Sequence, residues 1–271
     1  MKKVILSMLC LLLGVGVCAA KKRDRKAEPF VNAREVTVTD AYNELEVMDM
    51  IHVFLEEDRD PSMVRIETEG ISADEVQVEA ESGILTLSCT SEGQKAMRKG
   101  NWKRNRARSI NVYVGVGALD KFICTGMATI HTEATIEQPS IQIDITGMGD
   151  AEMNLACDRL LMTLSGMSDF KGMAECRDEA RIDLSGMSDC RIEGETKDFN
   201  LYVGGMSDYK GQMFEASGKT RCTVSGMSDA KVNCTGTIEL ELDGWSGLKL
   251  SGDPQVLSSS VMKGSSLKMK K

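Results

Sequence analysis

Aspartate recurs through the second half of the chain at intervals of 19 to 21 residues, and a basic residue follows most copies two positions later. Paired carboxylates can cleave glycosidic bonds, and clustered carboxylates can bind calcium. Here the aspartates and the basic residues each recur at one position of a repeat, so stacked repeats would place them in two adjacent columns. This predicts an acidic column and a basic column that neutralise each other. We therefore expect a structural role without calcium. The acidic set is Asp150, Asp169, Asp189, Asp208 and Asp229, and the basic set is Lys171, Arg191, Lys210, Lys231 and Lys249.

Other groups that could do chemistry give no catalytic pattern. His52 lies in an alternating segment and is interpreted as a surface or packing residue, whereas His131 takes a place in the basic column. The sequence has no nucleophile elbow, phosphate loop or zinc signature. We therefore expect no enzyme activity, no cofactor and no metal site, and we assign no catalytic residue.

Nine cysteines would suggest disulfides in an exported chain, but their positions argue otherwise. There is no pair of cysteines separated by two residues, and four of the nine fall on positions expected to point inward, where cysteine behaves as a small apolar residue. We expect buried thiols and no disulfide network. These four are Cys124, Cys190, Cys222 and Cys234.

The elements that position these groups are set by a repeat. The run Ser165-Gly166-Met167-Ser168-Asp169 returns at 185–189, 204–208 and 225–229, with degenerate copies on both sides. Such a period indicates one structural unit used about eight times, and it moves the functional question from a pocket to a surface. The repeated glycines are Gly126, Gly147, Gly166, Gly186, Gly205, Gly226, Gly244 and Gly264.

Apolar residues alternate with polar ones on both sides of each glycine, which predicts a strand, a corner and a second short strand. About 20 residues are too few for a strand plus a helix or for a propeller blade. The fold class predicted is all-β, a single-stranded parallel β-helix (β-solenoid) over 120–271, with a less regular β-rich part over 30–119. The inward column two residues before the glycines is Cys124, Ile145, Leu164, Leu184, Val203, Val224, Leu242 and Met262.

A large apolar residue follows most of the glycines directly. If the strand alternation continues through the corner, these side chains point outward and form a stripe that would serve as an interaction site. If the chain bends at the glycine, they turn inward and fill a corner of the core. We adopt the outward interpretation. The set is Met127, Met148, Met167, Met187, Met206, Met227 and Trp245.

The N-terminal residues read as a targeting segment. Lys2 and Lys3 precede an apolar stretch over 4–17, which predicts a secretory signal over 1–20 and export to the periplasm, the outer surface or the medium. Cys18 offers lipidation as the alternative to plain cleavage, and membrane contact is expected only through that lipid. The charged leader over 21–29 is expected to be disordered.

One segment is rich in basic residues, although the whole chain carries a net charge of −8. It would suit a polyanion such as lipopolysaccharide or an acidic glycan, or it is a solvated hairpin loop between 85–87 and 110–114. An acidic chain with few aromatic residues is a poor candidate for nucleic-acid binding. The segment contains Lys95, Arg98, Lys99, Trp102, Lys103, Arg104, Arg106 and Arg108.

The chain resembles the domain of unknown function 2807 family, DUF2807, also described as the "putative auto-transporter adhesin head GIN domain" and common in Bacteroidetes. The resemblance covers roughly 30–250. It is carried by the Ser-Gly-Met-Ser-Asp array and by the opening strands around Val36, 51–55, 64–67, 83–87 and 110–114. It implies an exported β-solenoid with an adhesive role, and it supplies no catalytic residues.

Three functions remain open at this point. A stiff rod with regular columns suits a non-catalytic, adhesin-like protein that binds a glycan or an envelope or host protein, or that associates with itself. An envelope scaffold or sensor is the second hypothesis. The third is a polysaccharide-active β-helix enzyme, which would need a carboxylate cluster that breaks the periodic background.

Overall fold

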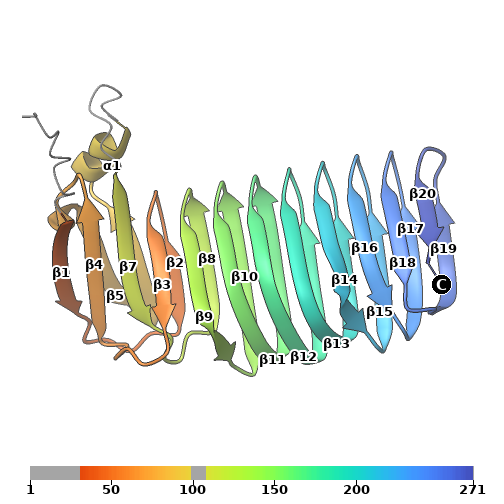
Figure 1. Cartoon of the computed structure of the whole chain (residues 1–271), viewed down its shortest axis with the longest axis horizontal. Helices are drawn as coiled ribbons and strands as arrows, with labels where there is room; N and C mark the ends of the chain where they lie inside the picture. The colour runs from red at the N-terminus through yellow and green to blue at the C-terminus, as the bar shows by residue number, and fades with distance from the viewer. Residues whose placement is uncertain (1–30, 99–107, 271) are drawn as a thin grey trace, which may run out of the picture.

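A computed structural model describes residues 31–98 and 108–270. Its strands lie across a long rod, with β1 and β4 at one end and β19 and β20 at the other (Figure 1). The signal segment, the charged leader, Cys18 and part of the basic segment lie outside the described residues. No helix of the described residues is long and apolar enough to cross a membrane.

The strands are β1 (Val31–Thr37), β2 (Glu44–Val47), β3 (His52–Glu56), β4 (Met63–Glu69), β5 (Val76–Glu81), β6 (Ile84–Cys89), β7 (Ser109–Gly115), β8 (Lys121–Gly126), β9 (Thr129–Glu137), β10 (Ser140–Gly147), β11 (Asp150–Gly166), β12 (Asp169–Leu184), β13 (Asp189–Val203), β14 (Asp208–Ala216), β15 (Lys219–Val224), β16 (Asp229–Cys234), β17 (Thr237–Leu242), β18 (Gly247–Ser251), β19 (Gln255–Val261) and β20 (Ser266–Met269). The helices are α1 (Ser91–Arg98) and the short 3-10 helix η1 (Ala73–Glu75).

Parallel pairing in register builds the solenoid. On one face of the rod, β8, β10, β11, β12, β13, β15, β17 and β19 pair in that order, each strand preceding a glycine corner. Leu164 pairs with Leu184 and Leu184 with Val203, so the inward column stacks as the alternation predicts. On the other face, the strands that follow the corners pair in the same way, in the order β9, β11, β12, β13, β14, β16, β18 and β20. The long strands β11, β12 and β13 contribute to both faces, with their first part to this face and their last part to the other.

The core lies between these two faces and consists mainly of apolar residues from the inward positions. Phe170, Cys190 and Ala230, four residues after their glycines, are all at most 2% exposed. The seven cysteines of the described residues are buried and free. Burial raises the pKa of Cys124 and of Cys222 to about 12, so these thiols stay protonated and fill space as apolar groups.

Tyr209 is a polar exception in this core. It is 1% exposed and packs against Phe199, with ring centroids 5.8 Å apart. Its hydroxyl has no hydrogen-bond partner among the described residues, and burial raises its pKa well above the usual value. The core therefore carries the desolvation cost of one unpaired polar atom.

Replacing Tyr209 by Phe is expected to stabilise the protein by roughly 1 kcal/mol, because the variant removes the unpaired hydroxyl and keeps the ring. Chemical denaturation would measure the change. Tyr202→Phe is the control, since that side chain is 43% exposed and its hydroxyl can be solvated. A destabilised Tyr209→Phe variant would mean that the hydroxyl is hydrogen-bonded in solution.

The N-terminal part continues the parallel stacking and then closes the rod. The coil made by β2 and β3 lies between β6 and β7 on one side and β8 and β9 on the other. Antiparallel strands cover the end: β1 pairs with β4, β4 with β7, and β5 with β6. Parallel coils therefore begin before residue 120, and antiparallel pairing is confined to the N-terminal end.

Two local expectations are wrong. The segment between β6 and β7 is not a hairpin, because the two strands pair with different partners on the two faces of the rod. Met262 is not part of the inward column, because it is 55% exposed. Val261, which pairs with Leu242 instead, is itself 43% exposed on the last coil.

Candidate functional site

The apolar residues that follow the glycines lie at the surface, as the outward interpretation predicts. We call this set, from Met127 to Trp245, the methionine edge. The corners that carry it follow one another along one edge of the rod (Figure 1). The exposed fractions are 41% for Met127, 47% for Met148, 48% for Met167, 48% for Met187, 52% for Met206, 63% for Met227 and 79% for Trp245.

Backbone hydrogen bonds stack these corners and fix the direction of the methionines. The amide of Met187 donates to the Gly166 carbonyl at 2.7 Å, and the amide of Met206 donates to the Gly186 carbonyl at 2.8 Å. The same bond joins each corner to the preceding one, so neighbouring methionines lie one strand spacing apart, about 4.8 Å. The structure thus brings the whole predicted set together as one continuous apolar surface.

A row of buried serines lies beneath the methionine edge, and the sequence analysis missed it. The Ser188 hydroxyl donates to the Ser185 carbonyl at 2.8 Å, and the Ser207 hydroxyl accepts from the Ser188 amide at 3.2 Å. The sequence feature that could have predicted it is a serine repeated two residues after the glycines, at an inward position where an unpaired hydroxyl would be costly. The serine hydroxyls thus form hydrogen bonds with backbone groups of the tight corner, and the methionines face solvent. It contains Ser168, Ser188, Ser207, Ser228 and Ser246, all at most 2% exposed.

The acidic column is in register, with Asp150, Asp169, Asp189, Asp208 and Asp229 paired in succession. Burial, and then the charge of Asp169, raise the pKa of Asp150. Neutralisation between the two columns is observed at Lys210, whose ammonium group lies 2.8 Å from Asp189 and 3.6 Å from Asp208. The hydrogen bond to Asp189 is the main cause of the raised pKa of Lys210.

The expected pairing between the columns is wrong for Lys171, whose partner is Glu152 of the preceding coil. Among the described residues, Arg191, Lys231 and Lys249 also make no ion pair with the acidic column. His131 also faces Glu152, with Nδ1 3.6 Å from Oε2, so it occupies the basic column as expected. The hydrogen bond from Lys171 lowers the pKa of Glu152. His52 is half-buried and its Nδ1 lies 2.8 Å from the Thr129 hydroxyl, which gives it a packing position.

We expect folding of this protein to be independent of calcium. Each strand contributes one aspartate to the acidic column, so the carboxylates form a line and do not gather around a point. The described residues contain no group of three or more His, Cys, Asp or Glu side chains that could hold a metal ion. Thermal unfolding in millimolar calcium and in chelator should give the same melting temperature. A rise of many degrees with calcium would show that the column binds it.

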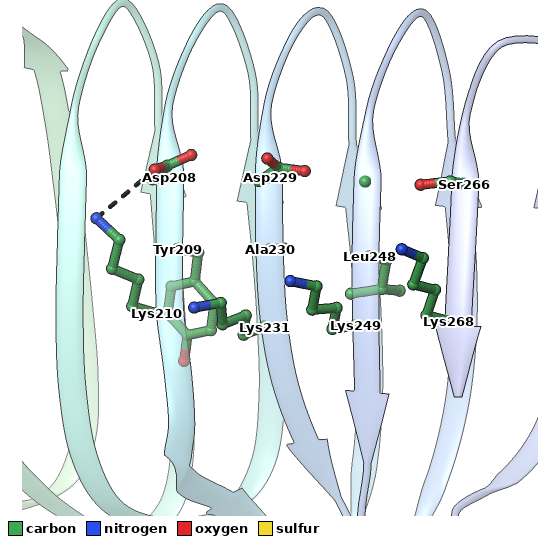
Figure 2. Close-up of a pocket in the computed structure, with 11 residues that line it drawn as sticks. Asp208, Tyr209, Lys210, Asp229, Ala230, Lys231, Leu248, Lys249, Ser266 and Lys268 are labelled. Carbon is green, nitrogen blue, oxygen red and sulfur yellow. Dashed lines mark ion pairs between the residues drawn. The ribbon is translucent and has the colours of Figure 1, made fainter. Parts of the chain in front are cut away.

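A cavity of about 380 Å³ lies on the face formed by β14, β16, β18 and β20. Figure 2 shows a row of lysines across these strands, with Asp208 and Asp229 beside its first two members. Beyond Asp229 the acidic column stops, because Gly247 and Ser266 take its next two places. The cavity lining therefore carries more lysines than carboxylates.

The basic segment is described only in part. Lys95 and Arg98 are exposed on α1, where Lys95 pairs with Glu92 at 2.8 Å, and Arg108 is half-buried just before β7. Lys99, Trp102, Lys103, Arg104 and Arg106 lie outside the described residues. The segment connects β6 to β7, the place that a short corner occupies in the other coils. A polyanion contact here stays a prediction.

Solved structures share this fold at low sequence identity. A crystal structure described as a "putative adhesin" from Parabacteroides distasonis is 18% identical, with a TM-score of 0.77, and the match covers 89% of this chain and 98% of that one. Another "putative adhesin", from Parabacteroides merdae, is 13% identical with a TM-score of 0.75 and coverage of 89% and 96%. A "putative lipid binding protein" from Parabacteroides distasonis is 17% identical, with a TM-score of 0.73 and coverage of 89% and 97%.

The family model gives the assignment. No curated protein matches the chain. The model of the family described as "Putative auto-transporter adhesin, head GIN domain" matches residues 41–254, which include the coil of β2 and β3 and every corner of the methionine edge. The chain therefore belongs to the DUF2807 family.

Proposed function

We propose that this protein is a non-catalytic, exported protein of the cell envelope that binds a protein partner through the methionine edge, in the manner of an adhesin. The family description and the structures described as adhesins support the general class. The observation that carries the proposal is the continuous row of seven exposed apolar side chains from Met127 to Trp245.

A row of this kind is unusual on a protein that contacts only water. Contiguous exposed apolar surface marks interaction sites, and methionine adapts its shape to different partners. Trp245, 79% exposed at one end of the row, is of the residue type that most often dominates binding energy at interfaces. Methionine offers no hydrogen-bond donor to sugar hydroxyls, so the edge suits an apolar protein surface better than a glycan.

The test compares two triple variants of the purified chain. Met167, Met187 and Met206 are replaced by serine in the first. Leu161, Met173 and Met213 are replaced by serine in the control, because these residues are also 37% to 63% exposed but lie outside the edge. Binding is measured on an array of purified extracellular and cell-surface proteins, with a glycan array alongside, and self-association is measured by sedimentation.

We expect the edge variant to lose binding by about tenfold or more while its melting temperature matches that of the control. Equal binding by both variants would contradict the role of the edge. A much lower melting temperature for the edge variant alone would show that the methionines support the fold of the corners. Wild-type binding to glycans and to none of the proteins would contradict the choice of partner.

A further inference from the structure

We propose that the C-terminal end of the rod binds a linear acidic polysaccharide along a row of lysines. The lysine row consists of Lys210, Lys231, Lys249 and Lys268, which line the cavity on the face of β14, β16, β18 and β20 (Figure 2). This site lies on a strand face, away from the corners that carry the methionine edge, and it does not depend on that edge.

The register of the strands sets the spacing of the lysines. Lys210 pairs with Lys231, Lys231 with Lys249, and Lys249 with Lys268. The four side chains therefore start from equivalent positions of successive strands, about 4.8 Å apart along the rod. An extended chain of acidic sugars carries its carboxylates at intervals of about one sugar ring, which is close to this strand spacing.

The charge balance changes along the rod. In the basic column up to Lys210, Lys171 pairs with Glu152 and Lys210 with Asp189, whereas Arg191 makes no ion pair among the described residues. After Asp229 the acidic positions hold Gly247 and Ser266, while the basic positions remain lysine. Among the described residues, the lysines of the row beyond Lys210 make no ion pair.

The local shape also favours a carbohydrate. Gly247 has no side chain and Ser266 has a small one beside the lysines. The Asp229 carboxylate lies so close to Gly247 that an added Cβ would clash with Asp229 Oδ1. The groove therefore offers ammonium groups for carboxylates and a carboxylate that can accept hydrogen bonds from sugar hydroxyls.

The experiment measures binding of an oligogalacturonate that is long enough to span four coils, by calorimetry with the purified chain. Replacing Lys231, Lys249 and Lys268 by glutamine should lower the affinity at least about tenfold, since three charge contacts are lost. Lys171→Gln is the control, because that lysine belongs to the same column and already has an acidic partner. Raising the salt concentration should weaken wild-type binding.

A second pair of variants tests the missing carboxylates without removing a lysine. Ser266→Asp returns one carboxylate to the acidic column and should weaken binding several-fold. Ser266→Asn, which has nearly the shape of aspartate without its charge, should leave the affinity close to that of the wild type. The Met167, Met187 and Met206 serine variant should bind the oligomer normally, so failure of one proposal is distinguishable from failure of the other.

Three results would overturn the inference. The triple glutamine variant binds the oligomer as tightly as the wild type. Free galacturonic acid binds as tightly as the oligomer, which would mean that the row does not recognise a chain. Vesicles of phosphatidylglycerol bind through the lysine row while the oligomer does not, which would assign the row to a membrane surface.

Discussion

Replacing Leu184 by aspartate is expected to unfold the middle of the rod, with a loss of roughly 4 kcal/mol or more in the free energy of unfolding. Leu184 is fully buried, and it is stacked between Leu164 and Val203 in the inward column. The variant removes apolar packing with both neighbours and places an unpaired carboxylate in the core. At this chain length the melting temperature should fall by about 10 °C.

Leu161→Asp is the matched control for this substitution. Leu161 lies in the same row of strands, on β11, but it is 37% exposed, so a carboxylate there stays in water. The control should unfold within a few degrees of the wild type. If Leu184→Asp unfolded as the control does, the side chain would not be part of a packed column.

Replacing Gly205 by alanine is expected to cost roughly 3 kcal/mol, although the change adds a single methyl group at the surface. Gly205 has a φ of 81°, a conformation that strains an alanine, and its added Cβ would lie 2.5 Å from the Gly186 carbonyl oxygen. That oxygen accepts the hydrogen bond from the Met206 amide that stacks the two corners. The variant must therefore separate adjacent coils or distort the corner.

The neighbouring glycine provides the control. Gly204 has no positive φ, and the three atoms nearest to an added Cβ all belong to the exposed Tyr202 side chain, which can move. Other copies of the repeat carry serine at this position. Gly204→Ser should change the midpoint of chemical denaturation little. Equal losses in Gly204→Ser and Gly205→Ala would show that the corner conformation is not the cause.

The sequence predicted the repeating part of the fold well because every determinant there is local. Alternation around Gly186 predicts which side of each strand is buried, and the constant interval to Gly205 predicts which residues of adjacent coils meet. The exposed direction of Met187 followed from the same alternation. These features depend on a few residues on either side of a glycine, and one sequence is enough to read them.

The sequence failed where the interval changes. The last corner is as long as the one before it, but its glycine comes one residue later: Gly244 lies two residues after Leu242, whereas Gly264 lies three residues after Val261, the partner of Leu242. Counting a fixed number of residues from the glycine therefore placed Met262 inside and passed over Lys268. Charge pairing was missed for a different reason: whether Lys171 meets Glu152 or an aspartate depends on side-chain reach, which spacing does not determine.

The place of the β2 and β3 coil has a consequence for how the chain folds. Both of its neighbours along the rod come later in the sequence: β6 and β7 lie on one side of it, and β8 and β9 on the other. The earliest coil thus gains its neighbours only when about half of the chain is available, and closing these loops is slow. We expect the N-terminal half to fold as one cooperative step, after which the later coils add one at a time on a finished template.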